Sequence, residues 1–233
     1  MREFADTHRR WGYKRALAAA REEGRDVGRD HFRRLWREEG LRVRPRKKSK
    51  RALDRTPTPR IKPATCPRDV WALDFQFDSD YTGRAFKICN VIDEFTRQHI
   101  AWKVSRSITA QSVVELLDLA VLEHGAPRVL RMDNGPEFIA HALADWVAEQ
   151  GAVQAFTPPG QPWHNGFVES LHNRMRDELL EDNLFDDIEH ASKMVKWWSN
   201  RYNNEHPHSS LGWKTPNQFA KEWEAQQQAH QSN

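Results

Sequence analysis

The sequence predicts an α/β protein in which a mixed five-stranded sheet flanked by helices follows a small all-α module. Residues 1–40 contain short helical patterns separated by glycines and no strand pattern. Residues 70–78 alternate apolar and polar side chains with the period of a half-buried strand. Strand and helix patterns then follow one another, which indicates an α/β domain. We expect four segments, at 1–45, 46–66, 67–204 and 205–233.

Three short helices are predicted in the all-α module. The first two cover residues 1–10 and 13–23, and the second ends at Gly24, because glycine readily adopts the left-handed backbone that closes a helix. The third begins near Gly28 and ends at Gly40. Two helices joined by a glycine-containing turn are typical of a helix-turn-helix motif.

The third helix has two distinct faces. Phe32, Leu35 and Trp36 are spaced to form an apolar stripe, whereas arginines recur every four residues on another face. A recognition helix that lies in a DNA groove has this arrangement. The alternative is a three-helix bundle whose basic face is merely solvated. The candidate DNA-binding residues of this helix are Arg29, Arg33 and Arg37.

A basic, proline-containing linker follows the module. Residues 42–51 are rich in lysine and arginine, and prolines follow at Pro57, Pro59 and Pro63. Like charges repel and proline blocks a helix, so we expect an extended segment that can lie along a DNA backbone. A nuclear localisation signal is the alternative for such a run. The candidate DNA contacts of the linker are Arg44, Arg46, Lys47 and Lys48.

Charge is divided unequally along the chain. Residues 1–62 hold 21 Lys and Arg against 9 Asp and Glu, whereas the remainder holds 15 against 24. The first part therefore carries +12 and the rest −9, although the whole chain carries only +3. This division is typical of a phosphate-binding arm joined to a domain with a metal-carboxylate site.

The remainder of the chain combines strands with helices. Strands are predicted near 70–78, 86–94, 98–104, 128–133 and 153–156, and helices over 109–124, 137–150 and 187–203. A further helix contains Glu169 and continues to about residue 180. Three consecutive antiparallel strands followed by strand–helix alternation is the order of the ribonuclease-H-like fold.

Three carboxylates occupy separate elements of this predicted domain. Asp74 lies on the first strand, opposite its aromatic face, Asp133 ends a short strand at a turn signal, and Glu169 lies in a helix. Between them lie 58 and then 35 residues. Open α/β sheets bind ligands at the carboxyl ends of their strands, and Mg²⁺ takes few protein carboxylates. Taken singly, each residue is more often a turn residue or a solvated surface charge.

The residues around these carboxylates resemble a known family, the transposases of the insertion-sequence-three family and in particular the product of their second reading frame. Its core is similar to that of the DDE transposases and retroviral-type integrases, in which 35 residues separate the last two acidic residues. The segments that carry the resemblance are residues 11–13 and 33–41 for the helix-turn-helix, 71–74, 133–138 and 165–170 for the catalytic motifs, and 206–212 with 215–216 for the tail.

The resemblance implies a bacterial DNA transposase that cleaves the ends of its element and transfers the 3′-hydroxyl into target DNA. It implies that Asp74, Asp133 and Glu169 are catalytic residues that bind two Mg²⁺ ions, for which Mn²⁺ can substitute. The implied partners are double-stranded DNA, as terminal inverted repeats and as target, further copies of the chain on DNA, and a separately encoded upstream helix-turn-helix subunit. The implied location is the cytoplasm, at the nucleoid.

Further candidate DNA contacts lie near Glu169. Trp163 and His164 precede its helix and can stack on or bond unpaired bases. Arg176 follows Glu169 by seven residues, about two turns along the same helix. One role for Arg176 is to bind DNA phosphates, and the other is an ordinary ion pair with Glu169 or Glu178 across the helix.

Composition limits the remaining alternatives. No apolar run approaches the length of a membrane-spanning helix, and Cys66 and Cys89 lack the paired spacing of a zinc site. Two other functions stay open: a ribonuclease-H-like nuclease that cuts without joining, and a non-catalytic DNA-binding regulator derived from a transposase. Inverted repeats on both sides of the coding sequence would distinguish a transposase from the nuclease.

Overall fold

The computed structural model describes residues 1–41, 63–157 and 165–231. The chain divides into two compact units. The first consists of Met1–Ile61 with His206–Lys214, and the second of Lys62–Glu205 with Thr215–Asn233. All three candidate catalytic carboxylates belong to the second unit.

The amino-terminal part of the first unit is all helical, as the sequence predicts. Its helices are α1 (Arg2–Thr7), α2 (Tyr13–Glu22) and α3 (Arg29–Glu38). Phe32 and Trp36 of α3 are buried and share one hydrophobic core with Ala16 and Leu17 of α2. The predicted apolar stripe of the third helix is therefore the face that packs.

Both glycines that were expected to end helices adopt the left-handed backbone. Gly24 has φ +79° and Gly40 has φ +71°, a region that other residues rarely enter. After each glycine, the next amide donates to a carbonyl five residues earlier, Arg25 to Ala20 at 3.0 Å and Leu41 to Trp36 at 3.2 Å. This hydrogen bond closes the helix and fixes the direction of the departing chain.

The second unit is built on a five-stranded sheet. Its strands are β1 (Val70–Ser79), β2 (Ala85–Asp93), β3 (His99–Ser105), β4 (Val129–Met132) and β5 (Val153–Phe156). Their spatial order is β3-β2-β1-β4-β5. The first three strands pair antiparallel, and β4 and β5 join in parallel beside β1. The mixed five-stranded sheet predicted from the sequence is therefore present.

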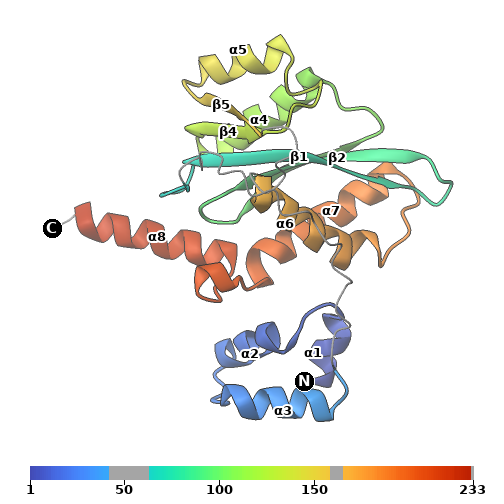
Figure 1. The fold of residues 1–233 in the computed structure, drawn as a ribbon, viewed down its shortest axis with the longest axis vertical. Helices are drawn as coiled ribbons and strands as arrows, with labels where there is room; N and C mark the ends of the chain where they lie inside the picture. The colour runs from blue at the N-terminus through green and yellow to red at the C-terminus, as the bar shows by residue number, and fades with distance from the viewer. Residues whose placement is uncertain (42–62, 158–164, 232–233) are drawn as a thin grey trace, which may run out of the picture. The chain divides into compact units, whose positions relative to one another are not determined.

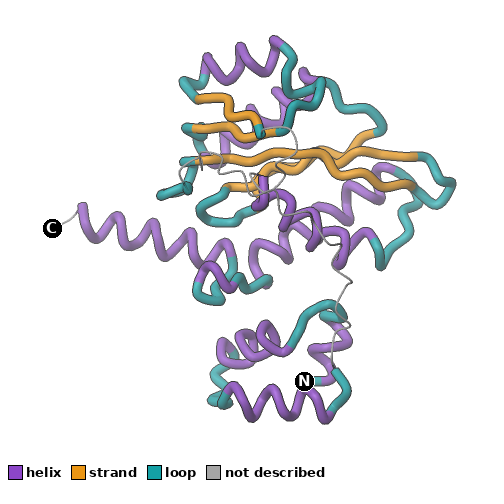
Figure 2. The backbone as a smooth tube through the Cα atoms, in the orientation of Figure 1, coloured by secondary structure: helices purple, strands orange, loops and turns teal. Residues whose placement is uncertain are grey.

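Helices cover both faces of the sheet, as Figure 1 shows. They are α4 (Ala110–His124), α5 (His141–Glu149), α6 (Gly166–Met175), α7 (Ile188–Glu205) and α8 (Pro216–Gln231). Helices α4 and α5 lie on one face, whereas α6 and α7 lie on the other (Figure 1). The tube drawing of Figure 2 shows the same layering of helix, strand and helix. Among the described helices, none combines the length and apolarity that a membrane span requires.

The alternation of β1 explains how Asp74 comes to face helix α6. Trp71 and Leu73 point into the core beneath α4 and α5, whereas Ala72 joins the core beneath α6 and α7. Successive side chains of a strand point to opposite faces, so Asp74 shares the face of Ala72. The expected placement of Asp74 opposite the aromatic face is thus correct.

Three helices differ clearly from those predicted. Helix α1 ends at Thr7 instead of residue 10. Helix α5 begins at His141 instead of residue 137, because the residues before it are held against the sheet, as described below. Helix α6 is followed by a π-helical turn, η2 (Arg176–Leu180), in which the amide of Glu181 donates to the carbonyl of Arg176 at 2.9 Å. The sequence pattern predicts a helix in this region, and it does not reveal the wider turn.

Candidate active site

Helix α6 is fastened to strand β1 by a series of side-chain hydrogen bonds to carbonyl oxygens. Asn165, at the start of α6, donates to the carbonyl of Leu73 at 3.5 Å. Gln76 of β1 donates to the carbonyl of His172 at 3.1 Å. Helix and strand therefore run side by side in the same direction. This attachment holds Glu169, which lies between Asn165 and His172, against the segment of β1 that carries Asp74.

The Asp133 carboxylate lies in a tight turn directly after β4. Its Oδ1 atom accepts a hydrogen bond from the amide of Gly135 at 2.9 Å. A Cβ atom on Gly135 would lie 3.0 Å from this same oxygen, so the turn favours glycine. Asn134 donates to the carbonyl of Thr157 at 3.0 Å, which ties the turn to the end of β5. Asp133 itself is exposed.

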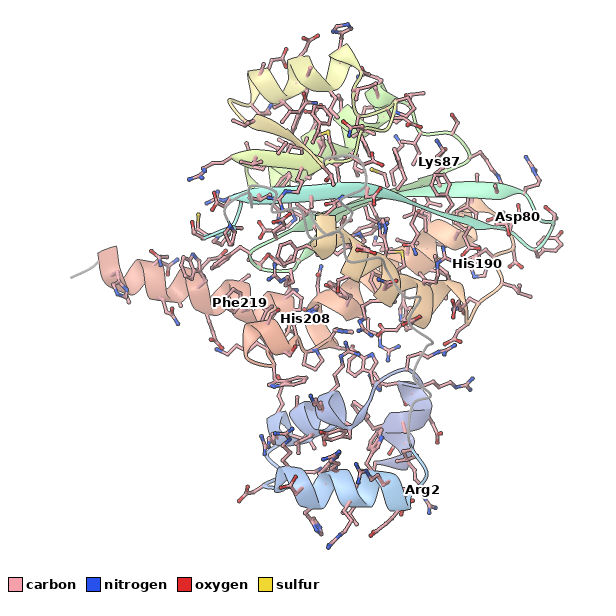
Figure 3. All side chains as sticks on the ribbon, in the orientation of Figure 1. Arg2, Asp80, Lys87, His190, His208 and Phe219 are labelled. Carbon is pink, nitrogen blue, oxygen red and sulfur yellow. The ribbon has the colours of Figure 1, made fainter. Side chains whose placement is uncertain are left out.

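An ion pair and an aromatic stack hold the rest of this loop on the sheet. Lys87 of β2, labelled in Figure 3, donates to Glu137 Oε1 at 2.7 Å. Phe138 is fully buried and stacks on Phe75 of β1, with 4.7 Å between ring centroids and 7° between planes. The Lys87 contact lowers the pKa of Glu137 below its usual value. These contacts explain why residues 137–140 lie outside α5.

The other two predicted carboxylates act electrostatically on Asp74. The pKa of Asp74 is raised to about 6, chiefly by burial and in smaller part by the negative charges of Asp133 and Glu169, against the effect of a hydrogen bond from the amide of Phe75. The β1 strand, the loop after β4 and helix α6 therefore bring the three groups to one region of the second unit. Like-charged carboxylates that crowd together favour a bound cation or a proton.

The donor set fits a hard divalent cation, since carboxylate oxygens are the protein ligands that Mg²⁺ and Mn²⁺ prefer. Within residues 1–41, 63–157 and 165–231, however, no three His, Cys, Asp or Glu side chains are gathered closely enough to form a ready-made metal site. The amide of Gly135 holds one oxygen of Asp133 in its own turn.

His172 is a neighbour of the site that the sequence interpretation missed. Its Nδ1 atom lies 3.9 Å from Asp74 Oδ2, and burial together with the positive charge of Arg176 lowers the pKa of His172 to about 4. The side chain is therefore neutral beside Asp74. Its spacing of three residues from Glu169 places it one turn along the same helix, and that spacing was a usable signal.

Arg176 contacts the strand instead of its own helix. It donates to the carbonyl of Phe77 at 2.8 Å, and its Nη1 atom lies 3.8 Å from Asp78 Oδ2. Both partners lie on β1, so the described contacts of Arg176 continue the attachment of α6 to β1. The alternative of an ion pair across the helix named Glu169 or Glu178, and neither is the acidic partner found at this distance.

The remaining candidate contacts fall in two places. In the first unit, Arg29, Arg33 and Arg37 are all exposed on α3. Arg33 lies over the ring of Tyr13 at 5.8 Å, and a hydrogen bond from Arg29 lowers the pKa of Tyr13. The others lie outside the described residues; these are Arg44, Arg46, Lys47, Lys48, Trp163 and His164.

Comparison with known protein families identifies the second unit. An integrase core domain family matches residues 64–162, and a second integrase core domain family matches residues 150–216. Among solved structures, the catalytic core domain of HTLV-2 integrase in complex with magnesium is similar to 67% of this chain and covers 99% of its own length, with a TM-score of 0.54 and 15% identity. The two proteins therefore share the ribonuclease-H-like fold that the strand order indicates.

Comparison with bacterial relatives extends over nearly the whole chain. An insertion element IS476 protein of Xanthomonas euvesicatoria is 37% identical over 97% of the chain, which spans 64% of that relative. An insertion element IS407 protein of Burkholderia multivorans is 34% identical over 94% of the chain, which spans 78% of it. The transposase of insertion sequence element IS904 from Lactococcus lactis is 27% identical over 68% of the chain, which spans 63% of it. The chain therefore belongs to the insertion-sequence-three family of transposases with an integrase core.

Proposed function

We propose that this protein cleaves DNA at the ends of its insertion element and transfers the freed 3′-hydroxyl into target DNA. The observation that carries the proposal is that Asp133 and Glu169, from a loop and a helix, come near enough to Asp74 on its strand for their charges to act on it. Both steps displace an oxygen at phosphorus, and neither requires a protein nucleophile.

Asp74, Asp133 and Glu169 would hold two Mg²⁺ ions, for which Mn²⁺ can substitute. When bound, such ions activate the attacking oxygen and stabilise the leaving one. Asp74 and Glu169 act as fixed ligands because β1 and α6 are attached to each other by hydrogen bonds. Asp133 would complete the set from the exposed turn after β4. His172 stays neutral and offers no positive charge that would compete with the ions.

Recognition of DNA falls to the basic first part of the chain. The exposed arginines of α3 and the basic segment that follows provide positive charge suited to a phosphate backbone. Arg176 can add a phosphate contact beside the carboxylates, because about a third of its side chain is exposed next to β1. Double-stranded DNA, further copies of the chain on DNA and a separately encoded upstream subunit are the proposed partners.

The proposal is tested with labelled duplexes that carry the ends of the protein's own element. In Mg²⁺ or Mn²⁺, wild-type protein should both cut these ends and join them to a second duplex, whereas Ca²⁺ should support binding alone because of its looser geometry. Cleavage without joined product would favour the ribonuclease-H-like nuclease. Binding without cleavage in any metal would favour the non-catalytic regulator.

The role of the basic part is tested through salt dependence. The logarithm of DNA affinity falls linearly with the logarithm of salt concentration. Each phosphate that the protein neutralises adds about 0.9 to the steepness of that slope. Replacing Arg29, Arg33 and Arg37 together by Gln should reduce this slope by about two to three units. A triple variant with the wild-type slope would mean that α3 presents only a solvated surface.

A further inference from the structure

A buried ion pair lies at the start of the segment that carries Asp133. Arg131 of β4, two residues before Asp133, donates to both oxygens of Glu94 at 2.7 and 3.0 Å. The exposed fractions of the two side chains are only 6% and 1%. Glu94 belongs to the turn between β2 and β3, and its amide donates to the carbonyl of Val70 at 2.9 Å. The ion pair therefore joins this turn to the strand that leads into the Asp133 loop.

The same turn reaches the segment that carries Glu169. Arg97, three residues after Glu94, lies over the ring of Phe167 with 3.9 Å between the guanidinium carbon and the ring centroid. Phe167 lies in the first turn of α6, two residues before Glu169. Burial lowers the pKa of Arg97, and the negative charge of Glu94 opposes this shift, so the two side chains act on each other. One short turn thus contacts neighbours of two of the three site carboxylates.

Both the backbone and the guanidinium group of Arg97 are in unfavourable surroundings. Its φ angle of 64° lies in the left-handed region, where a glycine would be unstrained. One of its guanidinium nitrogens, Nη1, is buried and has no hydrogen-bond partner among the described residues. Buried charges are themselves expensive, and replacing them by apolar groups is often neutral or stabilising. Stability alone is therefore a poor explanation for an arginine here, whereas a defined geometry between two segments is a good one.

We propose that Glu94, Arg97 and Arg131 form a positioning bridge, which sets the distance between Asp133 and Glu169 and thereby the affinity of the site for divalent metal. The inference rests on the proposed function, because it assumes that these carboxylates share metal ions. None of the three residues is among the proposed metal ligands. They act through Phe167 at one end and through β4 at the other.

Metal binding without DNA tests the bridge. Mn²⁺ is titrated into the full chain and followed by its electron paramagnetic resonance signal. Arg97→Ala and Phe167→Leu should each weaken Mn²⁺ binding about 10-fold, the size of effect that residues supporting metal ligands have. Arg97→Lys keeps the charge and loses the planar stack, so it should fall between wild type and Arg97→Ala. Glu94→Gln keeps the shape of the side chain and should also weaken binding.

Arg106→Ala is the matched control. Arg106 is another partly buried arginine of the same unit, and its ion-pair partner is Asp80 in the turn between β1 and β2. This variant should lose thermal stability and keep wild-type Mn²⁺ affinity. Wild-type affinity in Arg97→Ala, or an equal loss in Arg106→Ala, would overturn the bridge. A third outcome is that wild-type protein binds Mn²⁺ and the bridge variants bind it more weakly, but wild-type protein does not cut DNA. In that case only the proposed function fails. Wild-type protein that binds no Mn²⁺ would overturn both.

Discussion

Asp74 and Asp133 carry the same functional group in opposite surroundings. Asp74 lies in the middle of a ten-residue strand between two paired neighbours, and it is partly buried. Asp133 lies in a loop, is exposed, and spends one carboxylate oxygen on its own turn. The pKa of Asp74 is raised by burial and by the other two carboxylates. Asp74 is thus fixed in the sheet and repelled by two other carboxylates, whereas Asp133 lies exposed on a loop.

This difference bears on how the proposed site limits the repulsion among its three carboxylates before metal binds. Three fixed carboxylates would repel one another strongly in a partly buried site. A carboxylate on a loop can stay apart until a cation draws it in. The loop must still return to one position, and the contacts of Lys87, Glu137 and Phe138 limit its motion. The predictions below test each half of this comparison.

The largest expected effect is the loss of activity on removal of either charge. Asp74→Asn and Asp133→Asn should each reduce cleavage and joining by roughly a thousand-fold, because a metal ligand that provides several kcal/mol in the transition state is lost. Binding to duplex ends, measured by gel shift, should stay close to wild type. Strand transfer that persists in either variant would remove that residue from the site.

The second effect concerns the loop. Lys87→Met should lower the joining rate about 10-fold without changing DNA affinity, since it releases Glu137 and with it the Asp133 loop. Glu137→Gln should do the same, and the double variant should be no worse than either single one. Lys103→Met is the matched control, because Lys103 forms an exposed pair with Glu115 at 3.1 Å on another part of the sheet. Additive losses in the double variant would show that the pair does not act as a unit.

The third effect separates the two aspartates by stability. In metal-free protein Asp74→Asn should raise the free energy of unfolding by about 1–2 kcal/mol, because it removes a partly buried charge that two carboxylates repel. Asp133→Asn changes an exposed group and should stay within about 0.5 kcal/mol of wild type. Urea unfolding in the presence of a chelator measures both values. Equal free energies of unfolding for the two variants would mean that the charge of Asp74 destabilises the folded protein no more than the charge of Asp133 does.

The smallest effect is the pH dependence of stability that comes from His99, which lies in the same sheet as Asp74. His99 of β3 is buried, and burial lowers its pKa to about 3, with a further contribution from His172. Below about pH 6.5 the unfolded chain binds a proton at His99, whereas the folded protein keeps this side chain neutral. The contribution of neutral His99 to stability is therefore complete above pH 6.5 and is lost as the pH falls. We expect a loss of about 1 kcal/mol between pH 6 and pH 5 from His99.

His99→Phe tests this pH dependence, because it keeps an aromatic ring beside Trp102 and Trp198. Urea unfolding curves at pH 7, 6 and 5 should be less sensitive to pH in the variant, by about one proton. His172 remains in both proteins and contributes the same residual slope. A variant with the wild-type slope would mean that His99 is not the group that titrates.

The sequence was most informative where the physics is local. The alternation over β1 and the glycines after α2 and α3 depend on neighbours within a few residues, and these elements appear where they were predicted. Local patterns also placed the three carboxylates on the correct elements, which are a strand, a turn after a strand and a helix. Family resemblance provided their combination into a site, which no local pattern contains.

The contacts that support the site were not predictable from patterns. Lys87 and Glu137 are 50 residues apart, and Glu94 and Arg131 are 37 apart. Each is an ordinary charged residue in its own segment, and its partner is known only once the strands are paired. The late start of α5 has the same origin, since residues 137–140 have a helical composition and a tertiary contact overrides it.

The π-helical turn after α6 bears on how this chain tolerates changes in length. In η2 a hydrogen bond spans five residues instead of four, so one more residue fits into the same turn. It also brings Leu179 and Leu180, which are adjacent in the chain, into the core together. A deletion of one residue in this turn can be absorbed by a return to the regular helix. The segment that carries Glu169 is thereby buffered against the loss of one residue from this turn.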